Sequence, residues 1–181
     1  LLFGILFLLT GLVYPLFLTG VAELAFPYQA HGSLVRDQRG MVIGSEIIGQ
    51  NWTGPLFFEG RPSSTPGNPY NAAQSGGSNL GPSNPALWEE VNTTIRHLEN
   101  LGMGSPWPAD LVTSSASGLD PHITLDAALL QVPIVADARG ISEAEVQALV
   151  YENIDSGLFA LDEVYVNVFS LNRALDEVAS P

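Results

Sequence analysis

A short run of hydroxyl, amide and glycine residues, "QSGGSN" at 74–79, has the composition of a reactive or ligand-binding loop. Successive backbone N–H groups in such a loop can bind an anion, and a serine between glycines can be a nucleophile. The nucleophile elbow requires Gly-x-Ser-x-Gly, and Gly81 comes one residue too late. A phosphate-binding P-loop requires lysine, which the chain lacks. We therefore expect first a contact within the fold or with a partner, and second a nucleotide contact, through Gln74, Ser75, Gly76, Gly77, Ser78 and Asn79.

A second stretch, "SSASGLDPH", places Ser117, Asp120 and His122 close together and raises the alternative of a membrane-anchored hydrolase. Catalytic triads normally draw their members from separate segments, because one short stretch does not give the required geometry. Asp120 is better explained as the N-cap of a helix that begins at His122. We therefore expect no catalytic residue in this chain.

The remaining chemistry is limited by composition. The three histidines stand in different contexts without metal-ligand spacing, and there is no cysteine, so no metal site is predicted. The chain has 19 acidic residues against six arginines and carries a net charge of −13. This charge argues against nucleic acid as a partner, because phosphates are repelled. The acidic surface fits either a saline habitat or the collection of cations near a membrane pore.

The elements that position these residues begin with an uncharged apolar run at 1–22. Its length is enough to cross a membrane, so residues 1–26 are predicted to form a single transmembrane helix; a cleavable signal peptide is the alternative. Small and hydroxyl side chains permit close helix packing in lipid, and proline is expected to kink the span. The candidate packing positions are Gly4, Gly11, Tyr14, Pro15, Thr19 and Gly20.

Residues 27–181 are predicted to form an α+β ectodomain. Apolar residues at 34–35 and 41–43 flank a turn and indicate a β-hairpin, and a long, aromatic-containing loop over 52–85 is expected to be packed. Helices are predicted from Pro85 to about Gly102, from His122, and after Ser142, where Glu145 completes a capping box. Residues 164–169 alternate as a strand, and 171–178 form a closing helix.

Six blocks in order resemble the KdpC family, the C subunits of the KdpFABC potassium-transporting P-type ATPases. They are "TGLVYPLFLTG", "GSEIIGQNW", "FFEGRPSS", "YNAAQSGGSNLGPSNPAL", "DLVTSSASGLDPHIT" and "VNVFSLNRALD". Residues of these blocks that carry the family's structural signature are Arg61, Asp110, Asp120, His122, Asn167 and Asn172.

The resemblance implies a non-catalytic, single-pass accessory subunit of the cell (inner) membrane, with its C-terminal domain outside the cytoplasm. The implied partners are membrane lipid, the channel-like subunit KdpA, the ATP-hydrolysing subunit KdpB and the small subunit KdpF. Potassium and MgATP are handled by the partner subunits, and this chain is expected to bind no cofactor. The family is described as assisting assembly and as a catalytic chaperone that raises the ATP affinity of KdpB.

Overall fold

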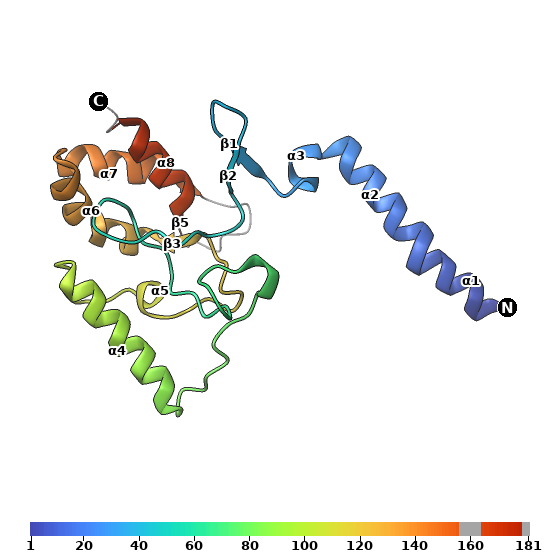
Figure 1. Cartoon of the computed structure of the whole chain (residues 1–181), viewed down its shortest axis with the longest axis horizontal. Helices are drawn as coiled ribbons and strands as arrows, with labels where there is room; N and C mark the ends of the chain where they lie inside the picture. Colours follow the sequence, from blue (N-terminus) through green and yellow to red (C-terminus); the bar gives the residue numbers. More distant parts are fainter. Residues whose placement is uncertain (156–163, 179–181) are drawn as a thin grey trace. The chain divides into compact units, whose positions relative to one another are not determined.

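A computed structural model describes residues 1–155 and 164–178 of the chain. The chain divides into two compact units, Leu1–Ile47 and Ile48–Pro181. Figure 1 shows the helices and strands of each unit. The boundary expected after residue 26 concerns the edge of the membrane and stays a prediction.

The first unit begins with a helix that is continuous from Leu2 to Ala25. It comprises α1 (Leu2–Leu8), a π-helical turn η1 (Leu9–Val13) and α2 (Tyr14–Ala25). Pro15 has no N–H to donate, and the turn before it is π-helical, with the Tyr14 N–H donating to the Leu9 carbonyl. This helix is long and apolar enough to cross a membrane.

A short helix, α3 (Pro27–Ala30), leads to a hairpin of β1 (Leu34–Arg36) and β2 (Val42–Ser45). The strands are antiparallel, with Leu34 opposite Ser45. The Asp37 carboxylate accepts hydrogen bonds from the backbone N–H groups of Arg39 and Met41 and so closes the turn. The predicted hairpin is therefore confirmed.

The second unit opens with a long segment without strands, in which the described structure forms only a short 3₁₀ turn, η2 (Ala72–Gln74). Phe58 in this segment is fully buried in the core, so the prediction of a packed loop is confirmed. Next come α4 (Pro85–Asn100), capped by the Asn84 side chain, and α5 (Ala109–Val112). The prediction of a helix starting at Pro85 is correct.

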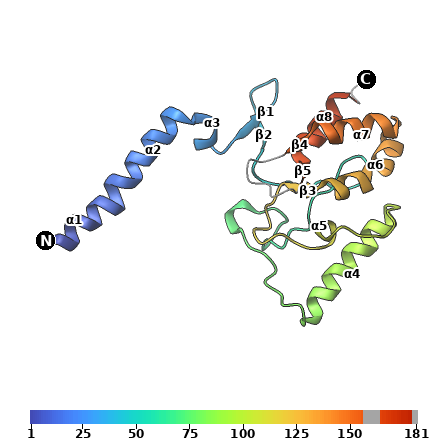
Figure 2. The same ribbon diagram turned by 180° about the vertical axis from the view of Figure 1, so that it is seen from behind.

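A small antiparallel sheet and three helices complete the unit, as Figure 2 shows from behind. The strand order is β3 (His122–Thr124), β5 (Tyr165–Asn167), β4 (Ile154–Asp155). The helices are α6 (Leu125–Arg139), α7 (Glu143–Glu152) and α8 (Val168–Val178). Buried aliphatic side chains of these elements form one core with Phe58, Leu98 and Leu111. The α+β class expected from the sequence is thus confirmed.

Two predicted boundaries were wrong. His122–Thr124 is a strand, because it pairs with β5, and Thr124 rather than Asp120 is the N-cap of the following helix. The strand predicted over 164–169 ends at Asn167, and α8 begins at Val168. The capping box of Ser142 and Glu145 is confirmed.

Candidate functional site

The "QSGGSN" loop packs against the loop at 115–118, which belongs to a different sequence block. The Gly76 N–H donates to the Ser117 carbonyl at 2.8 Å, and the Ser75 hydroxyl donates to the same oxygen at 3.0 Å. A Cβ atom on Gly77 would lie 3.0 Å from the Ser115 carbonyl oxygen. Gly77 therefore permits close contact between two backbones, and the N–H group of Gly76 is already used inside the fold.

At the exposed end of this loop, the Asn79 side-chain amide donates to the Gly77 carbonyl at 3.1 Å. The Ser78 hydroxyl accepts a long hydrogen bond of 3.5 Å from the Leu80 N–H. The Gln74 side chain is exposed. Among the six loop residues proposed from the sequence, Gln74 and Asn79 thus lie at the surface, while Ser75 and Gly77 contact the neighbouring loop.

Four of the signature residues lie in one chain of polar contacts. The Arg61 guanidinium lies 3.3 Å from the Asp120 carboxylate, which also accepts the His122 backbone N–H at 3.0 Å. The His122 ring lies 3.5 Å from Asp120 on one side and 3.5 Å from the Asn167 amide on the other. The pairing of β3 with β5 sets the last contact, since His122 is opposite Asn167. This series of polar contacts connects the long loop to the sheet.

The electrostatics of this cluster keep Asp120 ionised. Partial burial opposes ionisation, but hydrogen bonds from His122 and the charge of Arg61 outweigh it and lower the pKa of Asp120. Nearby, the Tyr70 hydroxyl donates to the Arg61 carbonyl at 2.6 Å. Burial and the charge of Asp120 raise the pKa of Tyr70 to about 12, so this donor keeps its proton at neutral pH.

The contacts of the Ser117 hydroxyl lie within its own loop. Its oxygen accepts the Leu119 N–H at 3.1 Å and lies 3.4 Å from the Ser115 hydroxyl. Within residues 1–155 and 164–178, no hydrogen bond joins Ser117 to His122, the contact that a serine nucleophile makes with its base. The described residues also contain no cluster of three or more potential metal ligands.

The other two signature residues hold backbone in place. The Asp110 carboxylate accepts the Thr124 N–H at 2.6 Å and the Thr124 hydroxyl at 3.2 Å. The Asn172 amide, fully buried on α8, bonds both backbone groups of Phe58. The sequence reasoning missed Gln131, whose buried amide does the same for Glu59. Its isolated position in the apolar run "AALLQVPIV" was the available signal.

A pair missed in the sequence connects α4 to the long loop. The carboxylate of Glu59, whose side chain is 11% exposed, lies 2.9 Å from His97 Nε2 in the last turn of α4. The same carboxylate accepts the Gly54 N–H at 3.1 Å. Of the helix itself only Leu98 is buried. Helix α4 is therefore held mainly by its C-terminal half.

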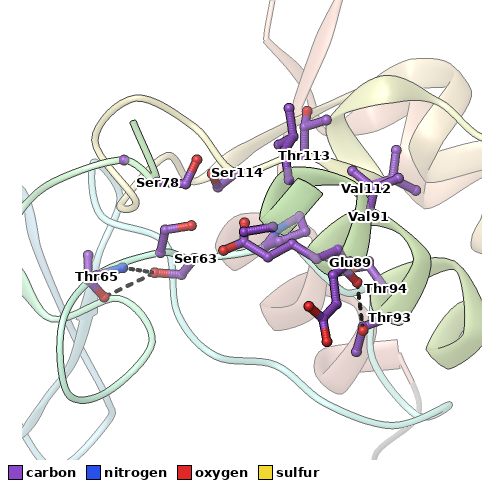
Figure 3. A pocket seen from close by; sticks show the side chains of 16 residues that line it. Ser63, Thr65, Ser78, Glu89, Val91, Thr93, Thr94, Val112, Thr113 and Ser114 are labelled. Carbon is purple, nitrogen blue, oxygen red and sulfur yellow. Dashed lines mark hydrogen bonds between the residues drawn. The ribbon is translucent and has the colours of Figure 1, made fainter. Parts of the chain in front are cut away.

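A groove of about 700 Å³ opens between α4 and the loops described above. Figure 3 shows Ser63, Thr65 and Ser78 on one wall and Glu89, Thr93 and Thr94 on the other. Three of the six sequence blocks contribute to it, the first at 62–64, the second at 77–78 and 86–87, and the third at 112–114. These three blocks therefore converge on one surface, which was not predicted.

The lining of this groove is acidic, hydroxyl-rich and partly apolar. Glu89 and Glu90 are its charged residues, none of the described lining residues is basic, and Leu87, Val91 and Val112 supply apolar surface. A phosphate would meet two carboxylates and no cation here, so this arrangement is unsuited to a nucleotide.

The described structure thus combines a helix that is long and apolar enough to cross a membrane with an α+β unit that carries a groove lined by three of the sequence blocks. A sequence model of the KdpC family, described as "K+-transporting ATPase, c chain", matches residues 1–177. The chain belongs to the KdpC family.

Relatives named potassium-transporting ATPase KdpC subunit are similar over nearly their whole length. The protein of Methanosphaerula palustris is 50% identical, with 97% of this chain and 92% of the relative covered. Those of Geobacter sulfurreducens and Sorangium cellulosum are 49% and 51% identical, each with 93% of this chain and 90% of the relative covered. Members of the family are subunits of the transport ATPase other than its catalytic subunit.

Proposed function

We propose that this chain is a non-catalytic accessory subunit of an ATP-driven potassium uptake pump and that it assists the assembly and stability of the complex. The observation that carries this proposal is the match to the family of ATPase c chains over residues 1–177. Residues 1–26 anchor the chain in the cell membrane in a single pass, and residues 27–181 lie outside the cytoplasm. The partners are the channel-like KdpA, the ATP-hydrolysing KdpB and the small KdpF.

The membrane helix supplies one contact with these partners. Gly4, Gly11, Thr19 and Gly20 leave open space around the helix backbone: a Cβ on any of the three glycines would meet nothing within 4 Å. The Thr10 and Thr19 hydroxyls donate to carbonyls four residues earlier, which satisfies them in lipid. A neighbouring helix can approach closely at these small residues. Tyr14 and Pro15 belong to the same contact region.

An effect on ATP affinity, as described for the family, is indirect in this proposal. With residues 27–181 outside the cytoplasm and ATP inside it, residues 74–79 have no access to nucleotide. The acidic lining of the groove supports the same conclusion. Any chaperone effect on KdpB then passes through subunit contacts, for which coupling free energies of about 1–3 kcal/mol are typical.

Co-purification and side-specific labelling test the proposal. The tagged full chain, extracted from its native membrane in mild detergent, is expected to retain the two large pump subunits. Intact cells carrying Ala144→Cys, on an exposed position of a cysteine-free chain, are expected to react with a membrane-impermeant maleimide. Recovery of the chain alone contradicts the accessory role. Labelling only after cell lysis contradicts the orientation.

A further inference from the structure

The N-terminal half of α4 forms one wall of the groove. The helix is 16 residues long, and its first turns project from the rest of the second unit in both views (Figures 1 and 2). Leu87 and Val91 on these turns, one turn apart, present apolar surface to the groove.

The charge of the groove selects among the classes of occupant. Glu89 and Glu90 repel nucleotides, anionic lipid headgroups and nucleic acid. A second copy of this chain, with its net charge of −13, is disfavoured for the same reason. A peptide segment with lysine or arginine beside apolar residues is complementary to both the carboxylates and the apolar strip.

The groove also offers polar groups for a peptide backbone. Among the described residues, the Ser64 and Ser114 hydroxyls have no side-chain hydrogen bond, and the Ser78 hydroxyl has only the long contact to Leu80. Thr93 and Thr94, by contrast, donate to carbonyls within α4. The volume of about 700 Å³ suits a few side chains rather than a whole domain.

We propose that this groove receives a basic peptide segment of one of the larger pump subunits. The proposal rests on the proposed function, because it names the contact that an accessory subunit would make. It assigns the contact to Leu87, Glu89, Glu90 and Val91 on α4, and places loop 74–79 in the groove wall through Gly77 and Ser78.

Photocrosslinking tests the contact itself. Ala86 lines the groove and is exposed, so Ala86→p-benzoylphenylalanine is expected to crosslink this chain to a larger subunit when membranes with the whole pump are irradiated. The matched control is Ala144→p-benzoylphenylalanine, an exposed position on α7, where at least tenfold less crosslinked product is expected. Mass spectrometry of the product is expected to identify a peptide with lysine or arginine.

Charge variants test the role of the two carboxylates in the groove. The double variant Glu89→Gln, Glu90→Gln is expected to dissociate from the complex about three- to tenfold faster at ~0.1 M salt, with a smaller difference at ~0.5 M. The control removes the same charge outside the groove, at the exposed Glu99 and Glu152.

The outcomes separate the two proposals. If the parent chain does not co-purify with pump subunits, the proposed function fails. If the complex is intact but Ala86 crosslinks only to lipid, to another copy of this chain or to nothing, the groove proposal is wrong. An equal effect of the two double charge variants also contradicts it.

Discussion

The side-chain amide of Asn172 and the main chain of Phe58 exchange two hydrogen bonds. The Phe58 N–H donates to Asn172 Oδ1 at 2.8 Å, and Asn172 Nδ2 donates to the Phe58 carbonyl at 2.9 Å. Gln131 repeats the arrangement one residue later, accepting the Glu59 N–H at 2.7 Å and donating to the Glu59 carbonyl at 3.1 Å. Two buried side-chain amides thus satisfy the backbone N–H and carbonyl groups of an irregular segment, as a neighbouring strand does in a sheet.

Asn172→Ala is expected to destabilise the chain by roughly 3 kcal/mol, because two buried backbone groups lose their partners. Urea unfolding of the detergent-solubilised chain, followed by tryptophan fluorescence, measures the change. Asn100→Ala, at an exposed position, serves as the control and is expected to change stability by less than about 0.5 kcal/mol. Equal stability of the two variants contradicts this role of Asn172.

The two glycines of the "QSGGSN" loop are expected to differ in how much their substitution by alanine destabilises the chain. Gly77→Ala places a methyl group about 3.0 Å from backbone atoms of Ser115 and Ala116, whereas Gly76→Ala meets nothing within 4 Å. We expect Gly77→Ala to cost about 1–3 kcal/mol by overpacking, and Gly76→Ala to be nearly neutral. Thermal unfolding of both variants gives the comparison. If Gly76→Ala is the more harmful change, the packing account of this loop is wrong.

Acid sensitivity is expected to involve Asp120. Folding lowers its pKa below the ordinary 3.8, so its contribution to stability is present above about pH 4 and disappears as pH falls through the folded value. The stability gap between the parent and Asp120→Asn, measured by urea unfolding, is therefore expected to be large at pH 7 and to narrow below pH 4. Asp137→Asn, at an exposed position, is the control. A stability difference between the parent and Asp120→Asn that increases below pH 4 contradicts this prediction.

Alkaline sensitivity is expected to involve Tyr70. Its pKa rises from 10.0 to about 12 on folding, so the folded state loses stability as pH rises above 10. Tyr70→Phe is expected to lower the free energy of unfolding by about 1 kcal/mol at pH 8, because the hydrogen bond to the Arg61 carbonyl is lost. The variant is also expected to lose less stability than the parent between pH 8 and 11. Tyr151→Phe, at a half-exposed side chain, is expected to leave that loss unchanged.

In the membrane helix, Gly11→Leu is expected to weaken co-purification with the large subunits. The helix leaves space around Gly11, so the leucine costs nothing within this chain and acts on a neighbouring helix. The yield of the complex in mild detergent is the measurement, with Val13→Leu as a control on another helix face. An unchanged yield means that this face is not the contact.

Local signals predicted the local structure well. The Asn84–Pro85 start of α4, the capping box of α7 and the hairpin turn depend on residues within a few positions of one another. The prediction of Asp120 as a helix N-cap was wrong, because an Asp-Pro pair also begins a turn into a strand. Only the pairing of β3 with β5 identifies that strand. The groove could not be predicted for the same reason, since its walls come from segments as far apart in sequence as Pro62 and Ser114.

The bonds between Asn172 and Phe58 have a consequence for synthesis of the chain. These partners are 114 residues apart, so the segment around Phe58 leaves the ribosome long before α8 exists to hold it. Contacts of such separation form late in folding. During translation the segment around Phe58 therefore cannot form these two hydrogen bonds until α8 has been synthesised.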